Sequence, residues 1–185
     1  MRKNFGVKPW MFPLPVMIIG TYDEAGNANA MNAAWGGICE ANRVMLCLDA
    51  EHKTTKNIRN TGAFTISFAD AEHVLAADYV GLVSGSSTAD KMARAGFHAV
   101  KSEFVNAPVI EELPVSLECR LVKVNEDGNI IGEIVNVGAD DRVVGMDGLI
   151  DTAKVDTISY DPVHNTYRRL GETVGNAFRD GAELG

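Results

Sequence analysis

Short strand-like segments, separated by clusters of turn-forming residues, constrain the fold of this chain more than any other feature of its sequence. Residues 115–124 and 130–137 are joined by Asn125-Glu-Asp-Gly-Asn129, a connection typical of a β-hairpin. Residues 63–68 alternate apolar and polar side chains, and this period of two predicts a half-buried strand. The apolar run of residues 15–22 predicts a buried strand that ends in a turn, and residues 43–49 predict another strand.

Helical segments are expected to be few and short. One helix is predicted between Thr54, as its N-cap, and Gly62, as its C-terminal stop. Two more are predicted in residues 72–82 and 89–95, the second with Thr88 as its N-cap. Many strands with few, short helices favour a mainly β protein, built as a closed antiparallel barrel, over a doubly wound sheet.

Length and charge restrict the class of protein. We expect one domain over residues 1–185. The formal net charge of −8 argues against nucleic acid as the main partner, because neutralising phosphates needs clustered Lys and Arg. The apolar run of residues 14–19 is too short for a membrane span, so no membrane partner is expected. The scattered cysteines form no disulfide or metal-binding pattern, and reduced thiols in a cytoplasmic protein are expected.

The segment from His52 to Asn57 has the composition of an anion site. A helix N-terminus presents unpaired N–H groups and the positive end of the helix dipole. Here His52 and Lys53 precede that end, Thr54 and Thr55 add hydroxyls, and Asn57 adds an amide. This combination suits a phosphate group. The alternative, a capped surface helix with a flanking lysine, is the commoner arrangement.

Residues 26–37 are rich in Gly, Ala and Asn. Small residues let a backbone approach a flat ligand closely, and exposed N–H groups then hydrogen-bond its edge. Trp35 either flanks a ring or packs in the core, and Asn29 and Asn32 either recognise a polar heterocycle or satisfy local backbone groups.

Two later segments are candidates for completing a ligand site. Ser84 begins a Gly/Ser loop that leads to Lys91, in the first turn of a helix, and this loop either closes over a phosphate or is simply solvated. Tyr167 and Arg168 either reach a ligand or belong to an ordinary final strand. Dinucleotide-binding Gly-x-Gly-x-x-Gly, Walker and nucleophile-elbow motifs are absent, and no side chain is assigned as a general acid or base.

Five groups of residues follow one another in a characteristic order between about residue 9 and residue 178. They are Pro13-Leu-Pro-Val16 with Ile19-Gly-Thr21; Asn29-Ala-Met-Asn-Ala-Ala-Trp35; Lys53-Thr-Thr-Lys-Asn-Ile58 with Gly62-Ala-Phe64; Asp90-Lys91 behind Ser84-Gly85; and Tyr160-Asp-Pro162 with Tyr167-Arg-Arg-Leu-Gly171. In this order they resemble the flavin reductase-like family and, within it, the flavoredoxins.

The resemblance implies a split antiparallel β-barrel that forms a homodimer and binds FMN non-covalently near the subunit interface. It implies that the isoalloxazine ring is lined, largely through backbone groups, by Asn29, Ala30, Met31, Asn32, Ala33, Ala34 and Trp35. It assigns the ribityl chain and phosphate to Asp49, Ala50, His52, Lys53, Thr54, Thr55 and Asn57. It places Ser84, Lys91 and Tyr167 at the rim, from the same or the second subunit.

The function implied by the resemblance is redox chemistry through FMN. Reducing equivalents would pass from NAD(P)H, as a transient donor, or from a protein donor to a small-molecule or protein acceptor. A non-enzymatic flavin store or sensor is the alternative. Two departures are noted: many relatives have Ser or Thr near Asn32, and many have a histidine at the end of the second hairpin strand, where this chain has Asn136-Val-Gly138.

Overall fold

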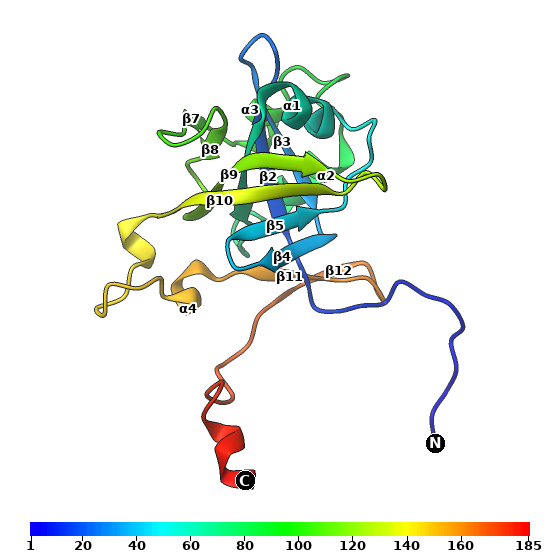
Figure 1. Cartoon of the computed structure of the whole chain (residues 1–185), viewed down its shortest axis with the longest axis vertical. Helices are drawn as coiled ribbons and strands as arrows, with labels where there is room; N and C mark the ends of the chain where they lie inside the picture. The colour runs from blue at the N-terminus through cyan, green and yellow to red at the C-terminus, as the bar shows by residue number, and fades with distance from the viewer.

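The computed structural model describes residues 1–185, except for the side chain of Glu183, and its centre is an antiparallel seven-stranded sheet (Figure 1). The strand order is β3-β2-β6-β9-β10-β5-β4. The bounds are β2 (Met17–Tyr22), β3 (Ala28–Ala33), β4 (Gly36–Glu40), β5 (Arg43–Leu46), β6 (Ala63–Phe68), β9 (Val115–Val124) and β10 (Ile130–Ala139).

Smaller elements surround this sheet. A three-stranded sheet has the order β1-β11-β12, and β7 pairs with β8. Among the described residues, no helix combines the length and the apolar character needed to cross a membrane. The bounds are β1 (Leu14–Pro15), β7 (Ala99–Lys101), β8 (Pro108–Ile110), β11 (Ile158–Asp161), β12 (Thr166–Arg169), α1 (Lys53–Thr61), α2 (Val74–Leu82), α3 (Lys91–Ala95), α4 (Thr152–Val155), η1 (Asp141–Val143) and η2 (Asp180–Leu184).

The apolar core lies on both faces of β2. Ile18 packs into a cluster with Val80 of α2, whereas its neighbour Ile19 packs into a second cluster with Phe64 of β6. Successive side chains of a strand point to opposite faces, so β2 must be apolar on both sides, as its sequence predicts. Gly20 lets β8 approach this strand, because a Cβ there would lie 2.6 Å from the Pro108 carbonyl oxygen of β8.

Strand β6 is buried on both faces, although its alternating sequence predicts a half-buried strand. Its polar face carries Thr65 and Ser67, both 0% exposed. The reason is tertiary: β8 covers that face, and the Thr65 hydroxyl donates to the Pro108 carbonyl oxygen at 2.6 Å. Alternation therefore identified the strand correctly but not the layer that covers its polar face.

Most of the predicted elements are confirmed, with changes at their ends. Strand β9 and the C-terminal stop of α1 at Gly62, with φ 69°, are as predicted, whereas residues 47–49 lie outside β5. The N-caps are wrong: α1 follows His52, and α3 follows Asp90. Residues 28–33, where no strand was predicted, form β3 because they pair along the whole of β2. The fold is mainly β and antiparallel, as expected, and the single-domain assignment stays a prediction.

Candidate functional site

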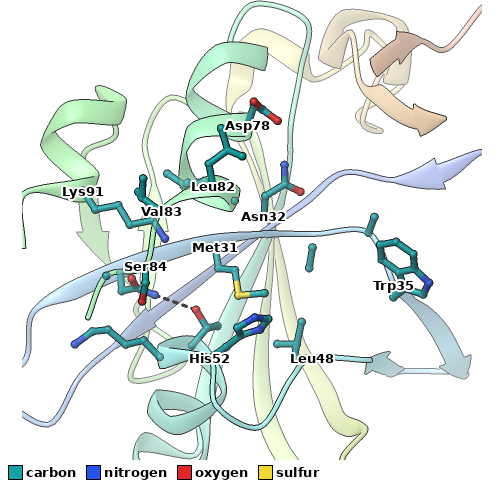
Figure 2. Close-up of a pocket in the computed structure, with 18 of the residues that line it drawn as sticks. Met31, Asn32, Trp35, Leu48, His52, Asp78, Leu82, Val83, Ser84 and Lys91 are labelled. Carbon is teal, nitrogen blue, oxygen red and sulfur yellow. Dashed lines mark hydrogen bonds between the residues drawn. The ribbon is translucent and has the colours of Figure 1, made fainter. Parts of the chain in front are cut away.

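A cavity of about 620 Å³ opens between β3, the N-terminus of α1, the loop after α2 and the β11–β12 hairpin. Its volume is within the range of about 300–1,000 Å³ typical of small-molecule sites. Figure 2 shows Lys91 and Ser84 on one side of the cavity and Trp35 on the other, with α2 residues above and His52 below. Segments far apart in the sequence therefore converge on one space.

Lysines gather where Lys91 and Ser84 lie. Lys53 forms a salt bridge with Asp23, with 3.1 Å between Nζ and the carboxylate oxygen. Lys91 is only 4% exposed, and burial lowers its pKa to about 8, with no neighbouring charge contributing to this shift. A buried ammonium group without a counter-ion is costly, so Lys91 leaves this part of the cavity prepared for an anion.

The N-terminus of α1 faces the same region. Its first residues, Lys53 and Thr54, line the cavity, and no acidic residue occupies the first turn. The N–H groups of that turn lack intrahelical acceptors and carry the positive end of the helix dipole. Gly85 lets the opposite loop approach, because a Cβ at Gly85 would collide with the Asn29 side-chain oxygen. The Lys91 ammonium group and the N-terminus of α1 thus both give this end of the cavity a positive potential.

The wall next to this region is formed by the backbone and small side chains of β3 and the residues that follow it. Met31, Ala33 and Ala34 line the cavity, and so does Leu48, which follows β5. Helix α2 packs closely on this strand, since a Cβ at Gly81 would lie 3.1 Å from the Cβ of Asn32. A flat, narrow wall of this kind suits a planar ring.

Aromatic side chains occupy the far side of the cavity. Trp35 is 48% exposed, and its ring centroid lies 6.4 Å from that of Tyr160. Tyr160 in turn lies 6.0 Å from Tyr167, centroid to centroid. Of the two interpretations of Trp35, core packing is therefore wrong, and its ring is available to a ligand.

A hydrogen-bonded group joins β3, α2 and β12 at the cavity wall. The amide of Asn32 donates to the Ala77 carbonyl oxygen at 3.0 Å and to the Tyr167 hydroxyl oxygen at 3.4 Å. The Tyr167 hydroxyl donates to the Asp78 carboxylate at 2.8 Å. Burial, followed by this carboxylate, raises the pKa of Tyr167 to about 12, so the hydroxyl keeps its proton at neutral pH.

Comparison with known proteins gives this cavity a family context. Residues 11–158 match the family model described as "Flavin reductase like domain". The chain belongs to the flavin reductase-like family. The matched residues include all seven strands of the large sheet and helices α1, α2, α3 and α4.

Solved structures of relatives share the fold. Flavoredoxin of Desulfovibrio vulgaris (Miyazaki F) is 37% identical, with a TM-score of 0.95 over 98% of this chain and 100% of that chain. Flavoredoxin from Methanosarcina acetivorans is 27% identical, with a TM-score of 0.88 over 99% of this chain and 100% of that one. An uncharacterised protein of Aeropyrum pernix is 29% identical over 64% of this chain. The matched part makes up 46% of the length of that protein. The fold is the split β-barrel that the resemblance implied.

The residues of this flavin reductase-like cavity fit FMN. The phosphate is an anion, and Lys91 and the α1 N-terminus supply the positive end, beside Lys53 in its salt bridge with Asp23. The isoalloxazine ring is flat, and β3 supplies a wall of small residues beside an available indole. When bound, FMN supplies two-electron and one-electron redox chemistry, which no amino-acid side chain of the cavity supplies alone.

The structure places most of the predicted site residues around this one cavity. Those that line it are Asn29, Met31, Asn32, Ala33, Ala34, Trp35, His52, Lys53, Thr54, Ser84, Lys91 and Tyr167. Their contact with FMN stays a prediction. Arg168, named beside Tyr167, does not line the cavity and instead lies 3.5 Å from the Asp161 carboxylate.

Five predicted residues do not line the cavity, and their contacts show why. Ala30 is fully buried in the core. Thr55 donates to the Asp49 carbonyl oxygen at 2.7 Å, and the Asp49 carboxylate accepts from the Glu51 N–H at 2.8 Å, which fixes the turn containing Ala50. Asn57 donates to the Thr21 hydroxyl oxygen at 3.0 Å. Asp49, Ala50 and Thr55 thus shape the β5–α1 connection, whereas Asn57 ties α1 to β2.

Several lining residues escaped the sequence interpretation. No short motif marks most of them, because α2 and the loop between β11 and β12 reach the cavity only through tertiary packing. One signal was available: Asp78 is the sole charged residue within the otherwise apolar α2. The lining residues not named as site residues are Cys47, Leu48, Asp78, Val80, Gly81, Leu82, Val83, Gly85, Tyr160 and Asn165, although Gly85 and Tyr160 belong to the motifs that carry the resemblance.

The end of the second hairpin strand, where the resemblance led us to expect a histidine, lies away from the first cavity. Asn136 lines a second cavity, of about 500 Å³, and its amide donates to the Glu118 carboxylate at 2.6 Å. Ser102 donates to the other oxygen of the same carboxylate. Within one chain, this departure therefore leaves the first cavity unchanged.

Proposed function

We propose that this chain binds FMN non-covalently in the first cavity and passes reducing equivalents through it. The observation that carries the proposal is the buried ammonium group of Lys91, which shares the cavity with the α1 N-terminus and the small-residue wall of β3 (Figure 2). An anion with a planar group attached satisfies all three features at once. Membership of the flavin reductase-like family and the likeness to two flavoredoxins support the same ligand.

The protein's part in this chemistry is to bind, orient and shield the ring. Lys91 and the α1 N-terminus fix the phosphate and therefore the direction in which the ring enters. Trp35 and Tyr160 offer aromatic surface, and Leu48 and Met31 keep water from one part of the ring. No residue is needed as a general acid or base in this account.

We propose that the electron donor is either NAD(P)H, as a transient visitor, or a redox protein. The sequence has no dinucleotide-binding fingerprint, and a donor that only stacks on an accessible ring needs none. The acceptor is correspondingly a small molecule or a second protein. A store or sensor of flavin is the alternative, and it predicts FMN binding without reduction by any donor.

We also propose that the protein is a cytoplasmic homodimer. Apolar side chains are exposed on three strands of the large sheet, with Ile38 of β4 at 67%, Val137 of β10 at 50% and Val122 of β9 at 42% exposure. We propose that these side chains form one apolar patch that the second subunit covers, since large exposed apolar patches mark interaction surfaces. Sedimentation at several protein concentrations tests this, and a monomer at all of them would refute the dimer.

The test of function has two stages. Purified protein incubated with FMN and then desalted is expected to keep the yellow chromophore in a 1:1 ratio. Stopped-flow mixing with NADH and, separately, NADPH is then expected to bleach it if the protein is a reductase. If FMN is retained but neither NADH nor NADPH bleaches it, the protein is either a carrier that a redox protein reduces or a flavin store or sensor. Failure to retain any flavin refutes the proposal itself.

A further inference from the structure

Asp78 is the one acidic residue among those that line the first cavity in the described part of the chain. It lies in the middle of α2, so neither end of the helix dipole compensates its charge. In Figure 2 its carboxylate lies beside Asn32, on the α2 side of the cavity and apart from Lys91. The cavity thus carries positive charge at one place and a separate negative charge at another.

The carboxylate is held in place by neutral groups. Its hydrogen bond comes from the Tyr167 hydroxyl at 2.8 Å, and no salt bridge to Asp78 is formed by the described residues. Tyr167 is itself positioned by Asn32, whose amide is anchored on the Ala77 carbonyl oxygen. The fixed donor keeps the carboxylate oriented without cancelling its charge, because a hydroxyl group is neutral.

The other titratable groups of the cavity wall are His52, Lys53, Lys91, Cys47, Tyr160 and Tyr167. Lys53 is already paired with Asp23. On the proposed function, Lys91 is occupied by the phosphate, which carries more than one negative charge near neutral pH. Neither lysine therefore neutralises Asp78. The negative charge of Asp78 acts on the part of the ligand that lies against Asn32 and β3.

Resting on the proposed function, we propose that the Asp78 carboxylate lowers the reduction potential of bound FMN, with Tyr167 and Asn32 as positioning residues. Oxidised FMN takes up two electrons with one proton to give a reduced ring carrying one negative charge, or with two protons to give a neutral one. A nearby negative charge disfavours the first product, whereas the second product is neutral and gives that charge little to act on. Anionic reduced FMN is therefore bound more weakly, relative to oxidised FMN, than it would be without Asp78.

Asp78 changes how the cavity treats reduced FMN. A cavity with only positive groups would stabilise the reduced, more negative ring and hold it as an end product. With Asp78 present, reduced FMN is a better electron donor, which suits a protein that passes electrons onward. The three residues named are far apart in sequence and meet only in the folded chain.

The test compares FMN-loaded wild type with Asp78→Asn and Asp78→Ser, two neutral replacements that can still accept a hydrogen bond from Tyr167. Glu72→Gln is the matched control, since it removes the same charge from an exposed residue two positions before α2. Each protein is titrated with dithionite against an indicator dye at fixed ionic strength, because salt screens the effect. Affinity for oxidised FMN is measured in parallel as the check on folding and binding.

We expect both Asp78 variants to raise the affinity for reduced FMN relative to oxidised FMN at least about fivefold. For a two-electron couple this is an upward shift of ~20 mV in midpoint potential. In Glu72→Gln the same affinity ratio should stay within about twofold of that of wild type. The inference would be overturned if the ratio of reduced-FMN to oxidised-FMN affinity stayed within about twofold of wild type in both Asp78 variants. A downward shift of the midpoint potential would overturn it as well. If wild type itself binds no FMN, the proposed function fails instead.

Discussion

Asn29 of β3 and Thr54 of α1 are joined by a buried hydrogen bond, in which the Asn29 amide donates to the Thr54 hydroxyl oxygen at 2.9 Å. This bond connects the wall proposed for the ring with the helix N-terminus proposed for the phosphate. Both residues are almost fully buried, at 3% and 2% exposure, so solvent does not replace the bond if it is lost. The two halves of the site are therefore positioned relative to one another before any ligand enters.

Removing that bond should destabilise the fold. Thr54→Val leaves the buried Asn29 amide without its acceptor, and we expect the free energy of unfolding to fall by about 1–3 kcal/mol. Urea denaturation measures it. Thr166→Val, the same chemical change at an exposed position of β12, should alter stability by less than about 0.5 kcal/mol. Equal effects of the two variants would contradict the structural role of the pair.

Lys91 should distinguish FMN from riboflavin, which lacks the phosphate. Lys91→Met removes the buried charge and keeps the apolar stem, so FMN binding should weaken by about 1.5–3 kcal/mol, the range for hydrogen bonds to charged groups. Riboflavin binding should hardly change, and Lys123→Met, at an exposed position, should change neither. Calorimetric titration with both ligands checks this. An equal loss for the two flavins would place the phosphate away from Lys91.

The pH dependence of FMN affinity follows from the pKa of Lys91, which burial lowers to about 8 in the free protein. The phosphate requires the charged ammonium group, so affinity should fall as pH rises above about 8, and Lys91→Met should remove this fall. Over the same range the unfolded chain binds more protons than the native one. Stability of the ligand-free protein should therefore rise from about pH 8 to about pH 10.4, the ordinary Lys pKa, and fluorescence-monitored denaturation tests this sign.

Gly85 should tolerate no side chain. A Cβ at that position collides with the Asn29 side chain, so Gly85→Ala should displace the loop or Asn29 at a cost of about 1–3 kcal/mol in stability, with weaker FMN binding. Gly171→Ala is the control, because nothing lies within 4 Å of its Cβ position. Thermal unfolding with and without FMN compares the two. A Gly85→Ala protein as stable as Gly171→Ala would show that the loop adapts.

Local signals predicted the parts of the fold that local chemistry determines. The hairpin around residues 125–129 depends on turn formers, and the end of α1 depends on Gly62 in a left-handed conformation, so both were visible in the sequence. Strand β3 was not, because Asn and Ala have low strand propensity and only pairing with β2 holds them extended. Thr54 was taken for an N-cap, yet its hydroxyl is committed to Asn29.

The site was predicted as four separate segments but not as a complete cavity. Residues 29–35 and 52–54 carry suitable side chains in sequence, so their composition pointed to a ring and an anion. The burial of Lys91 and the meeting of Asp78 with Tyr167 depend on how α2, α3 and β12 pack, and no short pattern encodes that packing. The electrostatics of the cavity therefore emerge only from the folded chain.

The central claim is that this cavity holds FMN by its phosphate and by its ring. Parallel titrations of the flavin-free protein with FMN and riboflavin, followed by flavin absorbance and fluorescence, test it most directly. We predict saturable 1:1 binding of FMN, with a perturbed flavin spectrum, and riboflavin binding at least about tenfold weaker, in keeping with the loss of a charged hydrogen bond. Unperturbed spectra with both flavins, or equal affinity for the two, would contradict the account.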